Sequence, residues 1–408
     1  MRAVSRLADA ATRALDLNDV ARDDGFLFVR DGVGFAGRGV AARVRVDEAA
    51  AVLAAIDHDD QTGIRAGDGG GIGPGPRALG WVPFVPGGAG EAVVPAVIVA
   101  KDPDGSCWVT TIAGDGIDGA SETLAPAGPP RPAADSYRLA PVTPVDTYLA
   151  AVAAARDAVN EERILKAVIA REISVTATAP IDRHGVLHRL KAAFGSSYRF
   201  AIDGFVGASP ELLVEVDGRT VRSTPLAGTA PRAGDPHQDA AIAAALIAST
   251  KNQIEHRVVI DVVHDTLLPW CSYLDWEPEP QVLTVANVQH LATRIEGQLS
   301  RPTPPVTTLV RALSPTPALG GHPRDEALAL IAEVEGVDRD RYGGAVGWTD
   351  AAGNGTWAVS IRCAQLSDDR RVARLHAGGG IVAESDPLAE LAETQAKFQA
   401  MLSALVRP

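Results

Sequence analysis

The sequence predicts an α+β fold, because short apolar strands and long helices occur in it without regular alternation along the chain. In the middle of the chain, strands are expected at residues 198–206, 212–216 and 220–223, with Gly, Asp and Pro between them. A helix is expected from about residue 237 to residue 267, where apolar residues recur at helical spacing. Closely spaced strands of this kind favour antiparallel pairing.

The remaining elements follow from local signals on either side of this region. A helix is expected over residues 143–160, with Thr143 as its cap, and an apolar run at 165–175 is typical of a strand. Asp386 and Pro387 predict the start of a closing helix. The side chain of Asp386 can cap the helix, and proline suits the first helical position because no backbone N–H is needed there. Three strands are expected before this helix, at 345–349, 357–363 and 372–376.

The composition is that of a globular protein with an excess of acidic groups. The 408 residues are 46% hydrophobic, enough for a large core, and the sequence contains no apolar run of 18 residues that would span a membrane. The net charge of −13 argues against general nucleic-acid binding, although a metal and a few basic groups can still hold a small anionic substrate. Three scattered cysteines fit a reducing cytoplasm. We therefore expect a cytoplasmic protein that binds neither nucleic acid nor membranes.

A Gly/Pro-rich stretch at residues 125–135 divides the chain. Such a composition is typical of a linker, so we predict a hinge there. The hinge separates an N-terminal portion, residues 1–135, from a larger region, residues 136–408.

Three charged residues near the C-terminus have the spacing of a metal or anion site. Glu390, Glu393 and Lys397 fall on one stripe of the closing helix, because residues three, four and seven apart share a helix face. The glycine run at 378–380 lies just upstream and offers unhindered backbone amides. Two carboxylates, an ammonium group and an amide-lined turn suit a divalent metal that holds an anionic ligand. A solvated helix face with mixed charges is the alternative interpretation.

Three further residues carry groups suited to acid–base or metal chemistry. Lys166 opens an otherwise apolar strand. The alternative to a functional role is that its side chain simply extends to solvent at the edge of the strand. Glu211 follows a turn between two strands, in which Ser209 is expected to have a turn role rather than a nucleophilic one. Glu255 lies in the long helix four residues after Lys251, and an exposed ion pair between them is the simpler interpretation.

His184 and His188 are four residues apart, a spacing that places two metal ligands on one helix face. The sequence offers no third ligand and no flanking glutamate beside them. A zinc site is therefore not predicted at this pair.

From Lys166 onward, the chain resembles the chorismate-using enzymes, and in detail the isochorismate synthases. The resemblance runs in order over about 240 residues, whereas the first 140 residues match only loosely. Further matches are the segment from Lys251 to His256 and the stripe from Glu390 to Lys397. The other matching segments are KAVIAR at 166–171, GASPELL at 207–213, PLAGT at 225–229, QHLAT at 289–293, PTPALGG at 315–321, YGGAVGW at 342–348, IRCA at 361–364 and AGGGIV at 377–382.

This resemblance implies a reaction in which a nucleophile adds to carbon 2 of the chorismate ring while the hydroxyl at carbon 4 leaves. Lys166 matches the family's water-activating lysine, and Glu211 matches its general acid. A lysine acts as a base only as the neutral amine, and Glu211 can act as an acid near neutral pH only if its pKa lies well above the ordinary value of about 4.3. Both conditions require a buried pocket.

The resemblance also implies a Mg²⁺ cofactor. Glu255 and Glu393 match the family's metal ligands, with Glu390 in the outer shell. Arg362 and the amide of Gly378 would hold the enolpyruvyl carboxylate of chorismate. The complete set of implied substrate contacts is Gly228, Thr229, His290, Ala318, Tyr342, Ile361, Arg362, Gly378 and Lys397.

The fold implied by the resemblance consists of two layered antiparallel β-sheets with helices packed outside. Residues 1–135 would contribute strands to this common fold, and residues 136–408 would form the chorismate-binding catalytic region. Relatives are often monomers, so we expect a monomer.

Four positions bear on the choice among the family's reactions. Relatives that use ammonia generally lack a lysine at position 166 and recruit a glutaminase, so Lys166 implies water as the nucleophile and no glutaminase subunit. Salicylate synthases, the alternative, also eliminate pyruvate and tend to carry threonine at 318, tyrosine at 342 and leucine at 361. Ala318 and Ile361 favour release of isochorismate, whereas Tyr342 matches the salicylate type. The product would supply a siderophore, menaquinone or another aromatic compound, a choice that the sequence leaves open.

Overall fold

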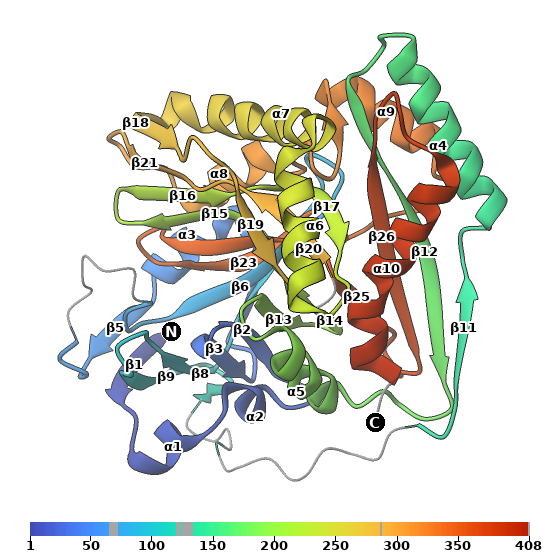
Figure 1. Ribbon diagram of the computed structural model, residues 1–408. Coiled ribbons are helices and arrows are strands. Elements are labelled where there is room, and N and C mark those ends of the chain that lie inside the picture. The colour runs from blue at the N-terminus through green and yellow to red at the C-terminus, as the bar shows by residue number, and fades with distance from the viewer. Residues whose placement is uncertain (65–71, 120–123, 125–133, 286–287, 407–408) are drawn as a thin grey trace.

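Two large β-sheets and one small sheet organise the protein, with helices packed outside them (Figure 1). The computed structural model describes residues 1–64, 72–119, 124, 134–285 and 288–406, so most of the hinge predicted at 125–135 lies outside the described residues. Among the described strands, β1 and β5 pair in parallel and the other pairs are antiparallel. The predicted α+β fold with layered antiparallel sheets is therefore confirmed.

The three sheets draw strands from both ends of the chain. The large sheet has the order β11 (Tyr137–Pro141), β12 (Lys166–Ala177), β26 (Val372–Ile381), β25 (Cys363–Leu366), β14 (Phe205–Ser209), β13 (Tyr198–Ile202), β2 (Phe26–Arg30), β3 (Val33–Arg38), β8 (Val97–Lys101), β9 (Cys107–Gly114), β1 (Arg2–Leu7) and β5 (Asp57–Asp60), with β10 (Ile117–Asp118) on β9 and β22 (Gly321–His322) on β12. The second sheet has the order β18 (Cys271–Trp276), β21 (Ile295–Leu299), β16 (Thr220–Thr224), β15 (Leu212–Asp217), β24 (Gly355–Val359), β23 (Ala345–Asp350), β6 (Arg77–Val82), β7 (Glu91–Val94) and β4 (Ala42–Arg45). The small sheet consists of β17 (Leu226–Pro231), β20 (Val288–Ala292) and β19 (Gln281–Thr284).

The helices cover the outer faces of these sheets (Figure 1). They are α1 (Ala10–Ala14), α2 (Leu17–Ala21), α3 (Ala49–Ala54), α4 (Val145–Asn160), α5 (Arg183–Phe194), α6 (Pro236–Ala248), α7 (Thr250–Leu267), α8 (Val306–Leu313), α9 (Arg324–Val334) and α10 (Pro387–Val406), with 3-10 turns η1 (Val46–Glu48) and η3 (Leu268–Trp270). Within the described residues, each helix falls short of the length and apolar character needed to cross a membrane.

Apolar side chains of the two large sheets meet in the main core. Phe35 of β3 contacts Trp348 of β23 edge-on, with ring centroids 6.3 Å apart, and both side chains are buried. A second core lies beneath α2, α5 and α10, and a third lies beneath α4 and α9. The large sheet is thus fixed on both faces, which holds β12 and β26 firmly in place.

Three predicted elements are interrupted in the structure. The strand expected at 198–206 is a hairpin of β13 and β14, because Asp203 and Gly204 adopt positive φ angles of 48° and 75°. The strand expected at 357–363 is likewise two strands, β24 and β25, and Arg362 lies between them with a φ of 51°. The helix expected at 237–267 is broken into α6 and α7 at Ser249, whose extended backbone ends one helix and starts the next.

Ser249 is expected to stabilise the start of α7 through its side chain. Its Oγ accepts a hydrogen bond from the backbone N–H of Asn252 at 3.3 Å. We predict that Ser249→Ala lowers the free energy of unfolding by about 1 kcal/mol and the thermal midpoint by about 1–3 °C in a melting experiment. Ser249→Thr keeps a hydroxyl cap and is the control; equal losses in both variants would contradict the role of the cap.

Candidate active site

A cavity of about 230 Å³ lies where β12 and β26 face α7, α10 and the small sheet. Every catalytic, metal-binding and substrate-binding residue predicted from the sequence lines this cavity. They come from segments that are as far apart in the chain as Lys166 and Lys397, so the fold brings together groups that no local pattern connects.

Lys166 lies at the start of β12 with its side chain only 4% exposed, so it does not reach out to solvent at the strand edge. Its Nζ donates a hydrogen bond to Oε1 of Glu255 on α7 at 2.7 Å. The ion pair recorded for Glu255 is therefore with Lys166 and not with Lys251, the partner that helical spacing favoured. Two charged groups in one shielded pocket attract each other strongly.

Glu211 lies in the turn between β14 and β15 and is almost fully buried. Burial raises its pKa to about 8, although the Leu226 N–H and the positive charges of Lys166 and Arg362 act to lower it. Ser209 has the predicted turn role, because its Oγ accepts a hydrogen bond from the Glu211 backbone N–H at 3.3 Å. Glu211 thus keeps a proton near neutral pH, as a general acid must.

The acidic stripe of α10 faces the cavity instead of solvent. Asp386 caps the helix as predicted, since its Oδ1 accepts a hydrogen bond from the N–H of Ala389 at 2.9 Å. Burial and repulsion from Glu393 raise the pKa of Glu390 to about 7. Burial acts to raise the pKa of Glu393 as well, but attraction to Lys397, at 2.6 Å, outweighs it and the pKa is lowered.

The glycine run of β26 makes room for these groups. A Cβ on Gly379 would lie 2.4 Å from Oε2 of Glu390, and one on Gly380 would lie 2.5 Å from Oε1 of Glu255 and 2.6 Å from Cε of Lys166. Real Cβ atoms essentially never approach other atoms so closely. The glycines therefore allow the carboxylates and the lysine to lie directly against the strand.

The carboxylates fit a hard divalent cation. Oε1 of Glu390 accepts a hydrogen bond from Ser385 at 2.8 Å, while its buried Oε2 has no hydrogen-bond partner among the described residues. Within the part of the chain that the structure describes, the oxygens of Glu255, Glu390 and Glu393 do not all come within 4.8 Å of one another. Oxygen ligands from one or two glutamates, with water in the remaining positions, are typical of Mg²⁺.

A second polar group lies on the side of the small sheet. His290 of β20 is buried, and its Nδ1 lies 3.0 Å from Oγ1 of Thr229, while its Nε2 lies 3.4 Å from Nη2 of Arg362. Burial, with repulsion from Arg362 and Lys397, lowers the pKa of His290 well below 6.5, so the ring is neutral. Neutral His290 and charged Arg362 together form a donor-rich wall that suits a carboxylate.

Tyr342 closes one end of the cavity. Its ring stacks on His376 of β26, with centroids 5.3 Å apart and an interplanar angle of 19°. Burial raises the pKa of Tyr342 to about 12 and lowers that of His376 to about 4, so both rings are neutral. His376 supports the tyrosine from behind and does not line the cavity itself.

Lys251 and Asn252 also line the cavity, and sequence reasoning did not select them as site residues. Lys251 attracts both Glu390 and Glu393, which opposes the rise in the pKa of Glu390 and helps to lower that of Glu393. Lys251 and Asn252 lie in the first turn of α7, four and three residues before Glu255. Residues at this spacing share a helix face, so the spacing could have predicted that both line the same cavity as Glu255.

Comparisons with known proteins agree with this geometry. A family model described as "Chorismate binding enzyme" matches residues 115–406. The putative isochorismate synthase MenF of Mycobacterium tuberculosis is 48% identical over 279 residues, which are 65% of this chain and 75% of that protein. The crystal structure of DhbC from Bacillus anthracis, a putative 2,3-dihydroxybenzoate-specific isochorismate synthase, has a TM-score of 0.77 and 31% identity and covers 95% of this chain and 96% of that one. MenF of Escherichia coli, the menaquinone-specific isochorismate synthase, shares the fold with a TM-score of 0.81 and 24% identity, over 99% of this chain and 94% of that one.

The fold and the relatives that share it define an enzyme. The chain belongs to the family of chorismate binding enzymes, as the match over most of its length shows. The resemblance found in the sequence is therefore confirmed.

The first prediction for this site concerns the glycine run. We expect Gly380→Ala to displace Lys166 or Glu255 and to lower chorismate turnover about 100-fold, because small misplacements of catalytic groups are costly. Gly114→Ala is the matched control, since its new Cβ would approach no atom closer than 3.4 Å at the far end of the large sheet. If steady-state kinetics showed near-normal turnover in Gly380→Ala, a Cβ at this position would not displace the catalytic groups, and the prediction would be wrong.

The second prediction concerns the proton on Glu211. Since its pKa is raised from 4.5 to about 8, the folded state holds a proton that the unfolded chain loses above pH 4.5. The free energy of unfolding therefore falls as the pH rises from 4.5 to about 8, and Glu211→Gln should remove this pH dependence. Thermal melts from pH 5 to pH 9 should show the variant gaining stability relative to the wild type. Glu48→Gln, at an exposed position, is the control, and parallel pH profiles for all three proteins would refute a raised pKa.

Proposed function

We propose that this enzyme isomerises chorismate to isochorismate in a Mg²⁺-dependent reaction. The observation that carries the proposal is that Lys166 and Glu211 line the same cavity, with the glutamate holding a proton at neutral pH. One residue can accept a proton and the other can donate one, which is what a substitution of one hydroxyl for another requires.

Lys166, which is paired with Glu255 as the ammonium, must first release a proton to solvent. In the proposed reaction its neutral amine then takes a proton from a water molecule that attacks carbon 2 of the ring. Glu211 donates its proton to the hydroxyl that leaves carbon 4, and the ring double bonds shift between the two carbons. One water enters and one water leaves, so the product is an isomer of the substrate. Lys166 ends as the ammonium and Glu211 as the carboxylate, and proton exchange with solvent resets both.

Charged groups of the cavity would hold the two carboxylates of chorismate. Arg362 and the Gly378 amide are proposed to bind the enolpyruvyl carboxylate, with Thr229 and neutral His290 beside them. Lys397 adds positive charge near the ring carboxylate and is itself positioned by the carbonyl oxygen of Gly378, which accepts its hydrogen bond at 2.8 Å. Gly228 lies across from Asn252, where its positive φ of 74° suits a residue without a side chain.

The metal site of the proposal consists of Glu255 and Glu393, with Glu390 in the outer shell. When bound, Mg²⁺ would neutralise the ring carboxylate and fix the ring in the cavity. The partner-free Oε2 of Glu390 and the clustering of like charges on α10 support a cation at this place.

We propose isochorismate rather than salicylate as the released product. Ala318 and Ile361 line the cavity where salicylate synthases tend to have threonine and leucine, although Tyr342 matches the salicylate type. The Mycobacterium and Bacillus relatives are named as isochorismate synthases, putative in both cases. The presence of Lys166 supports water as the nucleophile and a reaction without a glutaminase subunit.

The direct test is a product assay. Purified protein is incubated with chorismate and Mg²⁺, and the products are separated by chromatography. We expect isochorismate as the main product, loss of activity with a chelator, and recovery when Mg²⁺ is added back. Salicylate and pyruvate as the main products would overturn the proposal in favour of the alternative.

A variant of the proposed base gives a separate prediction. Lys166→Ala should reduce turnover by about 1,000-fold or more, because general-base catalysis contributes factors of 10²–10⁴. Chorismate binding, measured by calorimetry with Mg²⁺ present, should change little, since Arg362 and Lys397 remain. Turnover close to that of the wild type would remove Lys166 from its proposed role.

A further inference from the structure

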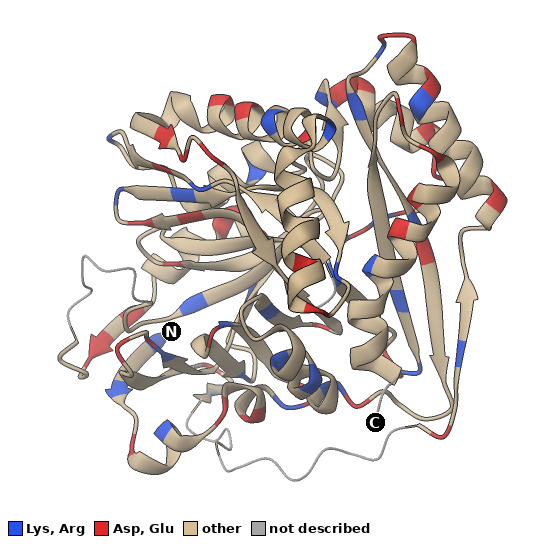
Figure 2. Ribbon diagram, in the orientation of Figure 1, with Lys and Arg blue, Asp and Glu red and all other residues tan. Residues whose placement is uncertain are grey.

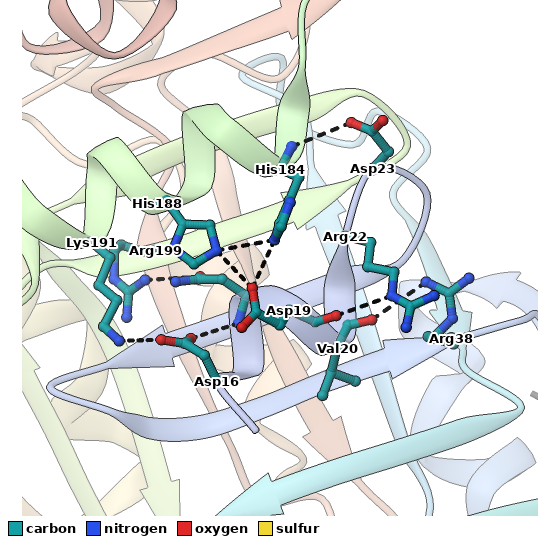
Figure 3. Close-up of polar contacts among 11 residues, drawn as sticks. Asp16, Asp19, Val20, Arg22, Asp23, Arg38, His184, His188, Lys191 and Arg199 are labelled. Atoms are coloured by element: carbon teal, nitrogen blue, oxygen red, sulfur yellow. Dashed lines mark hydrogen bonds and ion pairs between the residues drawn. The ribbon is translucent and has the colours of Figure 1, made fainter. Parts of the chain in front are cut away.

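A second cluster of ligand atoms lies between α2 and α5, outside the active-site cavity (Figure 3). Oδ1 of Asp19 lies 2.8 Å from Nε2 of His184 and 2.8 Å from Nε2 of His188, and the two nitrogens lie 3.0 Å apart. The sequence showed no third ligand beside the two histidines, whereas the fold places the Asp19 carboxylate there. Asp19 is 165 residues away from His184 in the chain, so only the fold could reveal it.

Hydrogen bonds alone do not account well for this triangle. If each ring donates an N–H to the single oxygen of Asp19, the two N–H groups lie side by side and repel each other. If one nitrogen is unprotonated, its lone pair faces the carboxylate. A cation bound to one side of the plane of the three atoms removes both conflicts, because it attracts one lone pair from each of them.

Contacts around the cluster hold the two helices that carry it (Figure 3). Both histidines lie on one face of α5, and their rings meet edge-on with centroids 4.6 Å apart. The backbone N–H of His184 donates to Oδ1 of Asp23 at 3.3 Å, and the backbone oxygen of Asp19 accepts from Nε of Arg22 at 3.2 Å. The carboxylate of Asp16, the cap of α2, is paired with Lys191 of α5. These contacts place the ligands before any ion binds, which lowers the cost of binding.

The cluster is accessible to an ion from solvent. The side chain of His184 is 9% exposed, whereas those of His188 and Asp19 are 34% and 29% exposed. Water can therefore fill the remaining coordination positions. Two imidazole nitrogens and one carboxylate oxygen suit Zn²⁺ or a similar transition ion, whereas Mg²⁺ prefers oxygen ligands alone.

We infer that Asp19, His184 and His188 form a binding site for Zn²⁺ or a related divalent transition ion, which joins α2 to α5. Asp19 lies outside residues 115–406 matched by the family model, whereas both histidines lie inside them. Helix α5 is joined in turn to the C-terminal end of α10, where Nε of Arg189 donates to the backbone oxygen of Ala404 at 2.6 Å. An ion at this point ties the N-terminal portion to the catalytic region, so its role is to stabilise the fold.

The test uses full-length protein without a polyhistidine tag, stripped of metal and then saturated with Mg²⁺ to occupy the active site. Titration with Zn²⁺ should show one bound ion per chain and a thermal midpoint that rises with Zn²⁺ concentration. His188→Gln and Asp19→Asn should each weaken Zn²⁺ binding by more than about tenfold while chorismate turnover stays within about twofold. Co²⁺ in place of Zn²⁺ should give visible absorption bands from the nitrogen and oxygen ligands in the wild type only.

A matched control separates this site from the active site. Glu393→Gln removes a proposed Mg²⁺ ligand and should leave Zn²⁺ binding at the Asp19 cluster unchanged. Absence of Zn²⁺ binding at micromolar concentrations, equal affinity in His188→Gln and the wild type, or loss of binding in Glu393→Gln would each overturn the proposal. The Co²⁺ spectrum of the wild type tests the site even if a variant folds poorly.

Discussion

The close approach of charged side chains to the glycine run of β26 is the constraint on which the active site depends. Oε2 of Glu390 and Oε1 of Glu255 lie only 2.4 Å and 2.5 Å from the places that Cβ atoms would take at Gly379 and Gly380. Strand β26 can lie so close to α10 and α7 only because it has no side chains there. Pairing of β26 with β12 then brings Lys166 against the same glycines. The glycine run of β26 thus sets the positions of the proposed base and of the carboxylates.

Burial decides the protonation states in this cavity. Glu211 and Glu390 have raised pKa values because they are shielded from water, while Glu393 is held ionised by Lys397. Chemically similar carboxylates can therefore take the different roles proposed for them, one as a proton donor and others around a metal ion. Acidic and basic residues are interspersed over the molecule in Figure 2, so the difference arises from burial and neighbours and not from a region of one charge.

The N-terminal portion is joined to the rest of the molecule by both large sheets. Strands β2 and β3 extend the large sheet next to β13, and β6 pairs with β23 in the second sheet. The cluster of Asp19, His184 and His188 joins the same two parts on the outer face of the large sheet. An ion there would stabilise the face of the sheet opposite the main core without contacting the cavity.

Local sequence patterns determined the elements and, through ordered motifs, the family. Helix α10 with its Asp386 cap, strand β12 and the set of cavity residues could be predicted, because caps, periodicity and motif order are properties of neighbouring residues. The breaks at Ser249 and Arg362 could not, since each depends on backbone angles imposed by packing. The partners of Glu255 and of the two histidines were also decided by tertiary structure alone. Lys166 and Asp19 reach them from distant segments, and spacing along the chain carries no information about such contacts.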